Sequence, residues 1–223
     1  MSVLICLSVA IVGVSYGVTA GSAGFSLWQL LALAVLVLGA SSEFLFIGII
    51  AAGGSATAAV VAGLLINSRN FAYGMSAGSF LGRDRYKDSG WRRGSGWRKL
   101  VGAHLVNDES VAVAMAQESV ERKRAAFWFC GIGIAVSWPI GALLGGLLGS
   151  VVRDPGALGL DAAFPVVILA LVFPALKEKV TLLAALIGAP VAVATSPFLP
   201  PGTAPLVALL SIAVTIPFRE KVR

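Results

Sequence analysis

The chain has 223 residues, of which 57% are hydrophobic and only 13% are charged, and its formal net charge is +6. This composition and a mean hydropathy of +0.90 exceed what a soluble domain can bury. The positive charge does not indicate a nucleic-acid partner, because nearly all Lys and Arg residues lie between or after apolar runs, as in the cytoplasmic loops of membrane proteins. The sequence therefore predicts a single integral membrane domain over residues 1–223, embedded in a lipid bilayer.

Seven apolar runs approach the length that a helix needs to cross a bilayer. The first run lacks the basic segment of a secretory signal, so we interpret it as a transmembrane helix. Gly and Pro residues within or at the ends of the runs predict broken or kinked helices. We expect an all-α polytopic membrane bundle of about seven spans. In chain order the runs cover residues 1–20, 27–43, 55–81, 125–151, 160–176, 180–197 and 203–218.

Residues 100–117 form a different kind of segment, because polar side chains interrupt an apolar helical pattern. The segment lies between two basic clusters, at 83–99 and 122–124. If both clusters are cytoplasmic, this helix re-enters the membrane or lies on its surface. The N-terminus is then outside and the C-terminus cytoplasmic, although eight crossings with other loop assignments are an alternative.

Three glycines, Gly141, Gly145 and Gly149, repeat every four residues and therefore share one helix face. Such a face lets another backbone approach closely. The neighbour is either a helix of the same chain or a helix of a partner subunit, and the pattern alone does not distinguish them.

Enzyme signatures are missing from the sequence. It has no phosphate-binding loop of the Walker type and no HExxH motif, and a single histidine leaves few ways to build a hydrolytic triad. Cys6 and Cys130 are far apart and lack the spacing of a metal site. We therefore expect no enzymatic activity, no cofactor and no metal.

Polar groups at membrane depth are costly and usually mark a solute pathway or a buried pair. The first such group, Ser41, Ser42 and Glu43, lies at the end of the second apolar run. An unwound helix end there would offer backbone groups to a substrate. The alternative is an ordinary polar loop at the membrane interface.

A second group, Asn67, Arg69, Asn70 and Tyr73, lies inside the third run. On a continuous helix the two asparagines share one face, and Arg69 and Tyr73 lie nearly opposite them. A helix that is polar on both sides must be enclosed by protein or border water. The planar guanidinium of Arg69 would suit a substrate carboxylate.

The third group is His104, Asp108 and Glu109, with His104, Asn107 and Asp108 on one face of the 100–117 helix. A carboxylate beside the single histidine suits proton coupling or gating, because histidine titrates near physiological pH. The alternative is a solvated helix whose acidic residues balance the basic clusters.

Arg69 also has a structural interpretation, in which it pairs with Glu43 or Asp161 to hold the bundle together. Because a guanidinium in hydrocarbon is costly, we expect it to contact an anion in every state. That anion would be the substrate carboxylate in one state and Glu43 or Asp161 in another. Asp161 itself fits a helix cap as well as a role in coupling or gating.

These segments resemble the AzlC type of branched-chain amino-acid permease. Four stretches carry the resemblance, in the order in which they occur in the family. They are 39–44, similar to A-G-S-A-Q-F; 67–74, similar to N-L-R-H-x-x-Y-G; 106–112, similar to L-x-D-E-S-F-A; and 161–165, similar to D-x-A-F-P. Glu43 stands where the family commonly has Gln, and Asn70 where it commonly has His, so charge and protonation at the site differ.

The resemblance implies the large subunit of a bacterial two-component exporter in the cytoplasmic (inner) membrane. It further implies secondary export of branched-chain or other hydrophobic amino acids, driven by an ion gradient, together with a small AzlD-like membrane subunit. The alternative function is a channel-like or structural membrane subunit without a substrate site of its own.

Overall fold

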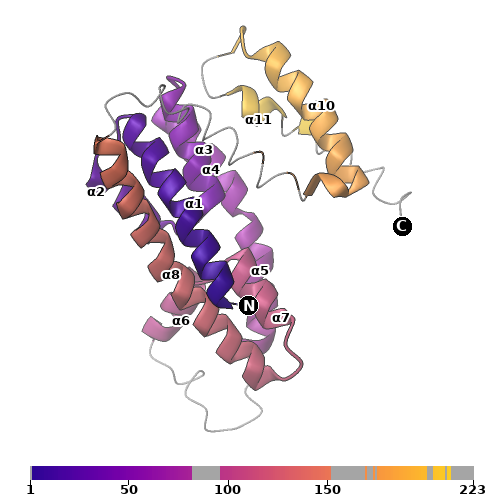
Figure 1. Cartoon of the computed structure of the whole chain (residues 1–223). Helices are drawn as coiled ribbons and strands as arrows, with labels where there is room; N and C mark the ends of the chain where they lie inside the picture. Colours follow the sequence, from indigo (N-terminus) through magenta and orange to yellow (C-terminus); the bar gives the residue numbers. More distant parts are fainter. Residues whose placement is uncertain are drawn as a thin grey trace.

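The computed structural model describes residues 2–81, 96–151, 169, 173, 175–199, 203–208 and 210–211, and within them it contains helices and no strand (Figure 1). The predicted all-α class is confirmed. The helices are α1 (Ser2–Ser22), α2 (Leu27–Leu36), α3 (Ala40–Ala51), α4 (Ala56–Asn67), α5 (Arg69–Leu81), α6 (Gly96–His104), α7 (Asp108–Met115), α8 (Val120–Val151), the short 3-10 helix η2 (Ala175–Lys177), α10 (Lys179–Thr195) and α11 (Ala204–Ala208).

Two helices of the described chain are long and apolar enough to cross a membrane. They are α1 and the segment Val120–Gly149 of α8, and they lie side by side (Figure 1). α2 and α7 also pack against α8, and α3 packs against α4. α10 and α11 pack on each other and lie to one side of this bundle in Figure 1.

The contact between α1 and α8 depends on glycine. A Cβ atom built on Gly141 would collide with the carbonyl oxygen of Ala10, and one on Gly145 would collide with that of Val14. The Gly141–Gly149 face therefore packs against a helix of the same chain. A partner subunit on this face, the other interpretation of the pattern, is ruled out because α1 already occupies it.

Aromatic side chains fill the centre of the bundle. Tyr16 of α1, Phe44 of α3 and Trp138 of α8 are each at most 2% exposed. The ring centroids of Tyr16 and Trp138 are 5.1 Å apart, and those of Tyr16 and Phe44 are 5.6 Å apart. This cluster holds the beginning of α3 against the two long helices, and the candidate site lies next to it.

Two of the predicted spans are not continuous helices. The 27–43 run divides into α2 and α3, and the chain turns at Leu38, whose φ is +50°. The 55–81 run divides at Ser68 into α4 and α5. Near each break a serine side chain hydrogen-bonds a backbone carbonyl oxygen: Ser42 Oγ donates to Gly39 O (2.8 Å), and Ser68 Oγ donates to Leu65 O (2.6 Å). Such bonds compete with the hydrogen bonds of a continuous helix.

The predicted 100–117 helix is also two helices, α6 and α7, separated by residues 105–107. Asn107 ends the separation by capping α7, and it exchanges hydrogen bonds with Ser110 in both directions. His104, Asn107 and Asp108 therefore do not share one helix face, which corrects our expectation. His104 ends α6, whereas Asp108 begins α7.

The prolines within the helices do not cause these breaks. Pro139 lies inside α8 and Pro190 inside α10, and both helices continue past them. Most of the 160–176 run, residues 212–218 of the last run and most of the 83–99 basic cluster lie outside the described residues.

Candidate functional site

The three helix breaks meet at one polar cavity of about 140 Å³. The breaks expose the N-termini of α3, α5 and α7 and the C-terminus of α4 to the same space. Since the first backbone N–H groups of a helix have no partner within it, three N-termini supply donors and positive potential. The lining residues are Leu38, Gly39, Ala40, Ser41, Asn67, Arg69, Asn70, Asn107, Asp108 and Glu109.

Arg69 links two of the breaks across this cavity. Its Nη2 donates to Ser41 Oγ at 2.8 Å, and its Nη1 lies 3.6 Å from Asp108 Oδ2. The Arg69 and Asp108 side chains are each 42% exposed, so the ion pair is accessible to a ligand and is weak enough to be exchanged. Arg69 does contact a carboxylate as expected, but its partner is Asp108 and not Glu43.

Two buried amide atoms at the cavity have no hydrogen-bond partner among the described residues. They are Asn67 Oδ1 and Asn107 Nδ2. Asn107 is only 7% exposed, and its own Oδ1 is already used to cap α7. This buried donor and this buried acceptor beside the same cavity are available to a polar ligand or to water, since unsatisfied buried polar groups are unfavourable.

The first turn of α7 brings two carboxyl groups to the cavity, Asp108 and Glu109. Burial raises the pKa of the Glu109 carboxyl above its usual range, and the adjacent Asp108 charge raises it further. Protonation and cation binding compete for such a group. It therefore suits either proton coupling or recognition of an ammonium ion.

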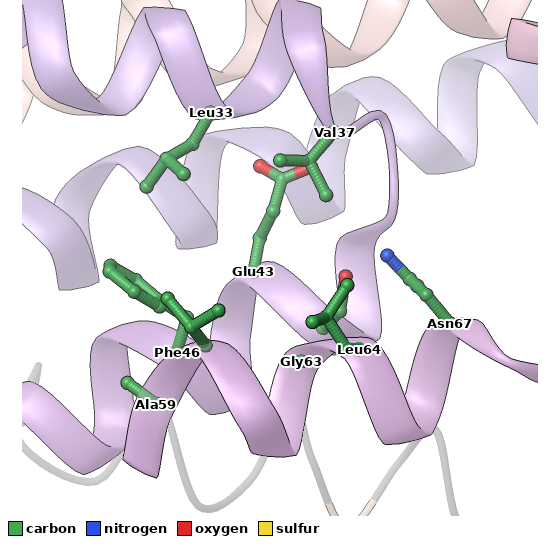
Figure 2. Close-up of a pocket in the computed structure, with 10 residues that line it drawn as sticks. Leu33, Val37, Glu43, Phe46, Ala59, Gly63, Leu64 and Asn67 are labelled. Carbon is green, nitrogen blue, oxygen red and sulfur yellow. The ribbon is translucent and has the colours of Figure 1, made fainter. Parts of the chain in front are cut away.

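An apolar cavity of about 150 Å³ adjoins the polar one, and Asn67 lines both. Figure 2 shows it between α2, α3 and α4, with Phe46, Leu64 and Leu33 around it and Gly63 in the wall formed by α4. The remaining lining residues are Val37, Ser42, Glu43, Ala59 and Val60.

Glu43 is directed away from the polar cavity. Its Oε1 accepts hydrogen bonds from Gly39 N (2.9 Å) and from Trp138 Nε1 (3.2 Å), and its Oε2 also accepts from Trp138 Nε1 (3.2 Å). Ser42 likewise lines the apolar cavity and bonds Gly39 O. Of the first predicted group, only Ser41 reaches the polar cavity.

The other predicted site residues are divided by the fold. Asn67, Arg69 and Asn70 do meet, because the break at Ser68 cancels the separation of faces expected on a continuous helix. His104 does not line the polar cavity, and its Nε2 lies 2.9 Å from Val35 O near the end of α2. Tyr73 packs against the hydrophobic core and lines neither cavity. Asp161 lies outside the described residues.

Gly39 and Asn107 line the polar cavity but were not among the predicted site residues, although both lie in the segments from which those residues were chosen. A Cβ on Gly39 would lie 3.0 Å from Asn67 Oδ1 and 2.8 Å from Ser42 Oγ, so a side chain there would displace two residues that line the cavities. For Asn107 a signal was present, because Asn is a preferred N-cap residue and the acidic Asp108 and Glu109 that follow it are typical of a first helical turn.

A comparison with protein families gives one result, a match of residues 4–152 to the family model described as AzlC protein. No curated protein and no solved structure matches the chain. The matched region covers more than half of the chain and contains both cavities, whereas the 161–165 stretch lies beyond it. The match and the apolar helices show that the chain belongs to the AzlC family of membrane transport proteins.

Proposed function

We propose that this protein is the large subunit of a secondary exporter of branched-chain or other hydrophobic amino acids. The observation that carries the proposal is the pair of adjoining cavities, one polar with charges of both signs and one apolar. Asn67 lines both cavities and therefore stands where the two parts of one ligand would join.

The polar cavity has the chemistry of an amino-acid backbone. Arg69 and the N-termini of α3 and α5 suit the α-carboxylate, through the guanidinium fork and the positive end of each helix dipole. Asp108 and Glu109 suit the α-ammonium group. Broken helices whose ends contact the ligand at membrane depth are a recurrent arrangement in secondary transporters.

The apolar cavity suits an aliphatic side chain. Its wall contains Leu33, Phe46 and Leu64, and burial of each methylene of a ligand there contributes about 0.8 kcal/mol. Substrate binding would also change the partner of Arg69, because a substrate carboxylate on its guanidinium would displace Asp108. A ligand that contacts two states differently shifts the equilibrium between them, as coupled transport requires.

Counterflow in proteoliposomes tests the proposal. The purified chain is reconstituted with and without the small AzlD-like subunit, and labelled L-leucine is exchanged against unlabelled L-valine, L-isoleucine, L-lysine or L-glutamate. We expect exchange with the aliphatic amino acids and not with the charged ones. A protein that exchanges none of them is a channel-like or structural subunit.

A further inference from the structure

Glu43 is a carboxyl group enclosed by protein in the centre of the bundle, with only 1% of the residue exposed. Its hydrogen-bond donors are the backbone N–H of Gly39 and the indole N–H of Trp138, and both are neutral. The described residues give it no Lys or Arg partner, and Arg69 is engaged with Asp108.

The other described groups around Glu43 do not supply a positive charge. From α1 the Tyr16 hydroxyl faces the carboxyl, and from α2 the side chains of Leu33 and Val37 line the same cavity as Glu43 and are drawn on either side of its carboxyl end (Figure 2). α4 contributes Asn67 at the same cavity. An ionised carboxylate in this apolar setting is costly, whereas a neutral carboxylic acid is not.

A neutral Glu43 needs an acceptor for its proton, and Tyr16 can provide one. The Tyr16 O–H donates to Leu30 O at 3.3 Å, so the phenol oxygen keeps its lone pairs for another donor. The carboxyl can thus donate to Tyr16 and still accept from Gly39 and Trp138.

We propose that Glu43 is the proton-binding site that couples transport to a proton gradient. It carries a proton in the conformation described here. On release, the O–H bond of the carboxylic acid breaks, the proton passes to water in the adjoining cavity, and the carboxylate keeps the negative charge. Rebinding of a proton from water reverses the step, and one proton is exchanged at each event. The proposal rests on the proposed transport function.

The link to substrate binding is the hydrogen bond between Glu43 Oε1 and Gly39 N. Gly39 is the N-cap of α3 and lines the polar cavity together with Ser41, which holds Arg69. A carboxylate accepts this hydrogen bond more strongly than a carboxylic acid does. Proton binding therefore changes the geometry of the break that forms the substrate site, and by linkage substrate binding changes proton affinity.

Glu43→Gln tests the proposal with little structural change. Oε1 accepts from both Gly39 and Trp138, so the amide oxygen of glutamine can keep both bonds, while the amide group binds no proton in this range. Glu121→Gln, at the exposed beginning of α8, removes a carboxylate outside the site and is the matched control.

Two transport measurements are made in proteoliposomes that hold L-leucine and a pH-sensitive dye. Counterflow of L-leucine requires no net proton movement, whereas net efflux driven by an imposed pH gradient does. For Glu43→Gln we expect the ratio of gradient-driven efflux to counterflow, and the ratio of the dye response to counterflow, to fall at least tenfold. Glu121→Gln should match the unsubstituted protein. Proton movement that is unchanged in Glu43→Gln, or lost in Glu109→Gln alone, overturns the proposal.

Infrared difference spectroscopy gives a readout that does not depend on transport. The C=O stretch of a buried carboxylic acid should be present in the unsubstituted protein and in Glu121→Gln, and missing in Glu43→Gln. If this band is equally strong in all three proteins, Glu43 is not protonated and the proposal fails. If the unsubstituted protein shows no counterflow for any amino acid, the transport proposal fails, and the infrared result still decides the protonation of Glu43.

Discussion

Arg69 contacts Ser41 at one helix break through Nη2 and Asp108 at another through Nη1. The guanidinium therefore depends on its planar fork of two nitrogen donors as well as on its charge. Lysine keeps the charge and loses the fork. We expect Arg69→Lys and Arg69→Gln to insert normally and to lose about 1.5–3 kcal/mol of substrate interaction, roughly a ten- to hundredfold decrease in counterflow.

Counterflow at matched protein levels measures this effect. Arg122→Gln, which removes an exposed guanidinium at the beginning of α8, is the control and should transport at the unsubstituted rate. Unchanged transport in both Arg69 variants would remove Arg69 from the substrate site and leave it a structural role.

Gly63 sets the size of the apolar cavity in the wall formed by α4. A Cβ at this position would lie 3.8 Å from Ser42 Cβ and Ser42 O, an ordinary contact, so alanine fits without displacing the backbone. We expect Gly63→Ala to fold and to change the preference for L-leucine over L-valine by about tenfold, since one methylene in an apolar pocket has an effect of this order.

Competition of the two unlabelled amino acids against labelled L-valine measures the preference. Gly78→Ala is the matched control, because a Cβ there meets no atom of the described residues within 4 Å and Gly78 does not line this cavity. An unaltered preference in Gly63→Ala would mean that the substrate side chain binds elsewhere.

The two long helices, α1 and α8, pack closely on each other at the glycines of α8. A side chain at Gly145 would meet the backbone of Val14, which cannot move as a flexible side chain can. We expect Gly145→Ala to cost about 1–3 kcal/mol of stability and to lower the thermal midpoint of the detergent-solubilised protein. Gly78→Ala should leave the midpoint unchanged or slightly higher, because alanine is the better helix former. Equal midpoints for the two variants would show that the helices pack more loosely here.

At the scale of the whole molecule, the sequence predicts that the basic segment 83–99 is cytoplasmic, since its Lys and Arg residues determine the orientation of short loops. Single cysteines introduced there, with Cys6 and Cys130 replaced by alanine, should resist an impermeant thiol reagent added to intact cells. They should react after the membrane is opened. Ready labelling from outside would reverse the predicted topology.

We also predict that the chain needs a partner subunit for full activity. The glycine face of α8 is occupied by α1, so a partner must use another surface. We expect counterflow to fall at least tenfold, about 1.4 kcal/mol in the transport barrier, when the AzlD-like subunit is left out of the proteoliposomes. Full activity of the purified chain alone would show that it is complete without a partner.

The sequence by itself determined the helical class, the membrane environment and the family. Each of these depends on composition, on the length of apolar runs or on local motifs, and all are properties of neighbouring residues. It also predicted six residues that line the polar cavity, because polar groups inside apolar runs stand out whatever the fold. They are Ser41, Asn67, Arg69, Asn70, Asp108 and Glu109.

Only the tertiary structure decided where the helices break and which groups face each other. Arg69 binds Asp108 because the helix breaks meet at one cavity, and Glu43 binds Trp138, 95 residues away, because the beginning of α3 packs against α8. Local periodicity assumed continuous helices and therefore placed Asn67 and Arg69 on opposite faces. Local serine hydrogen bonds favour both breaks, but the sequence pattern does not show which serine ends a helix, so the positions of the Leu38 turn and the Ser68 break came from the structure.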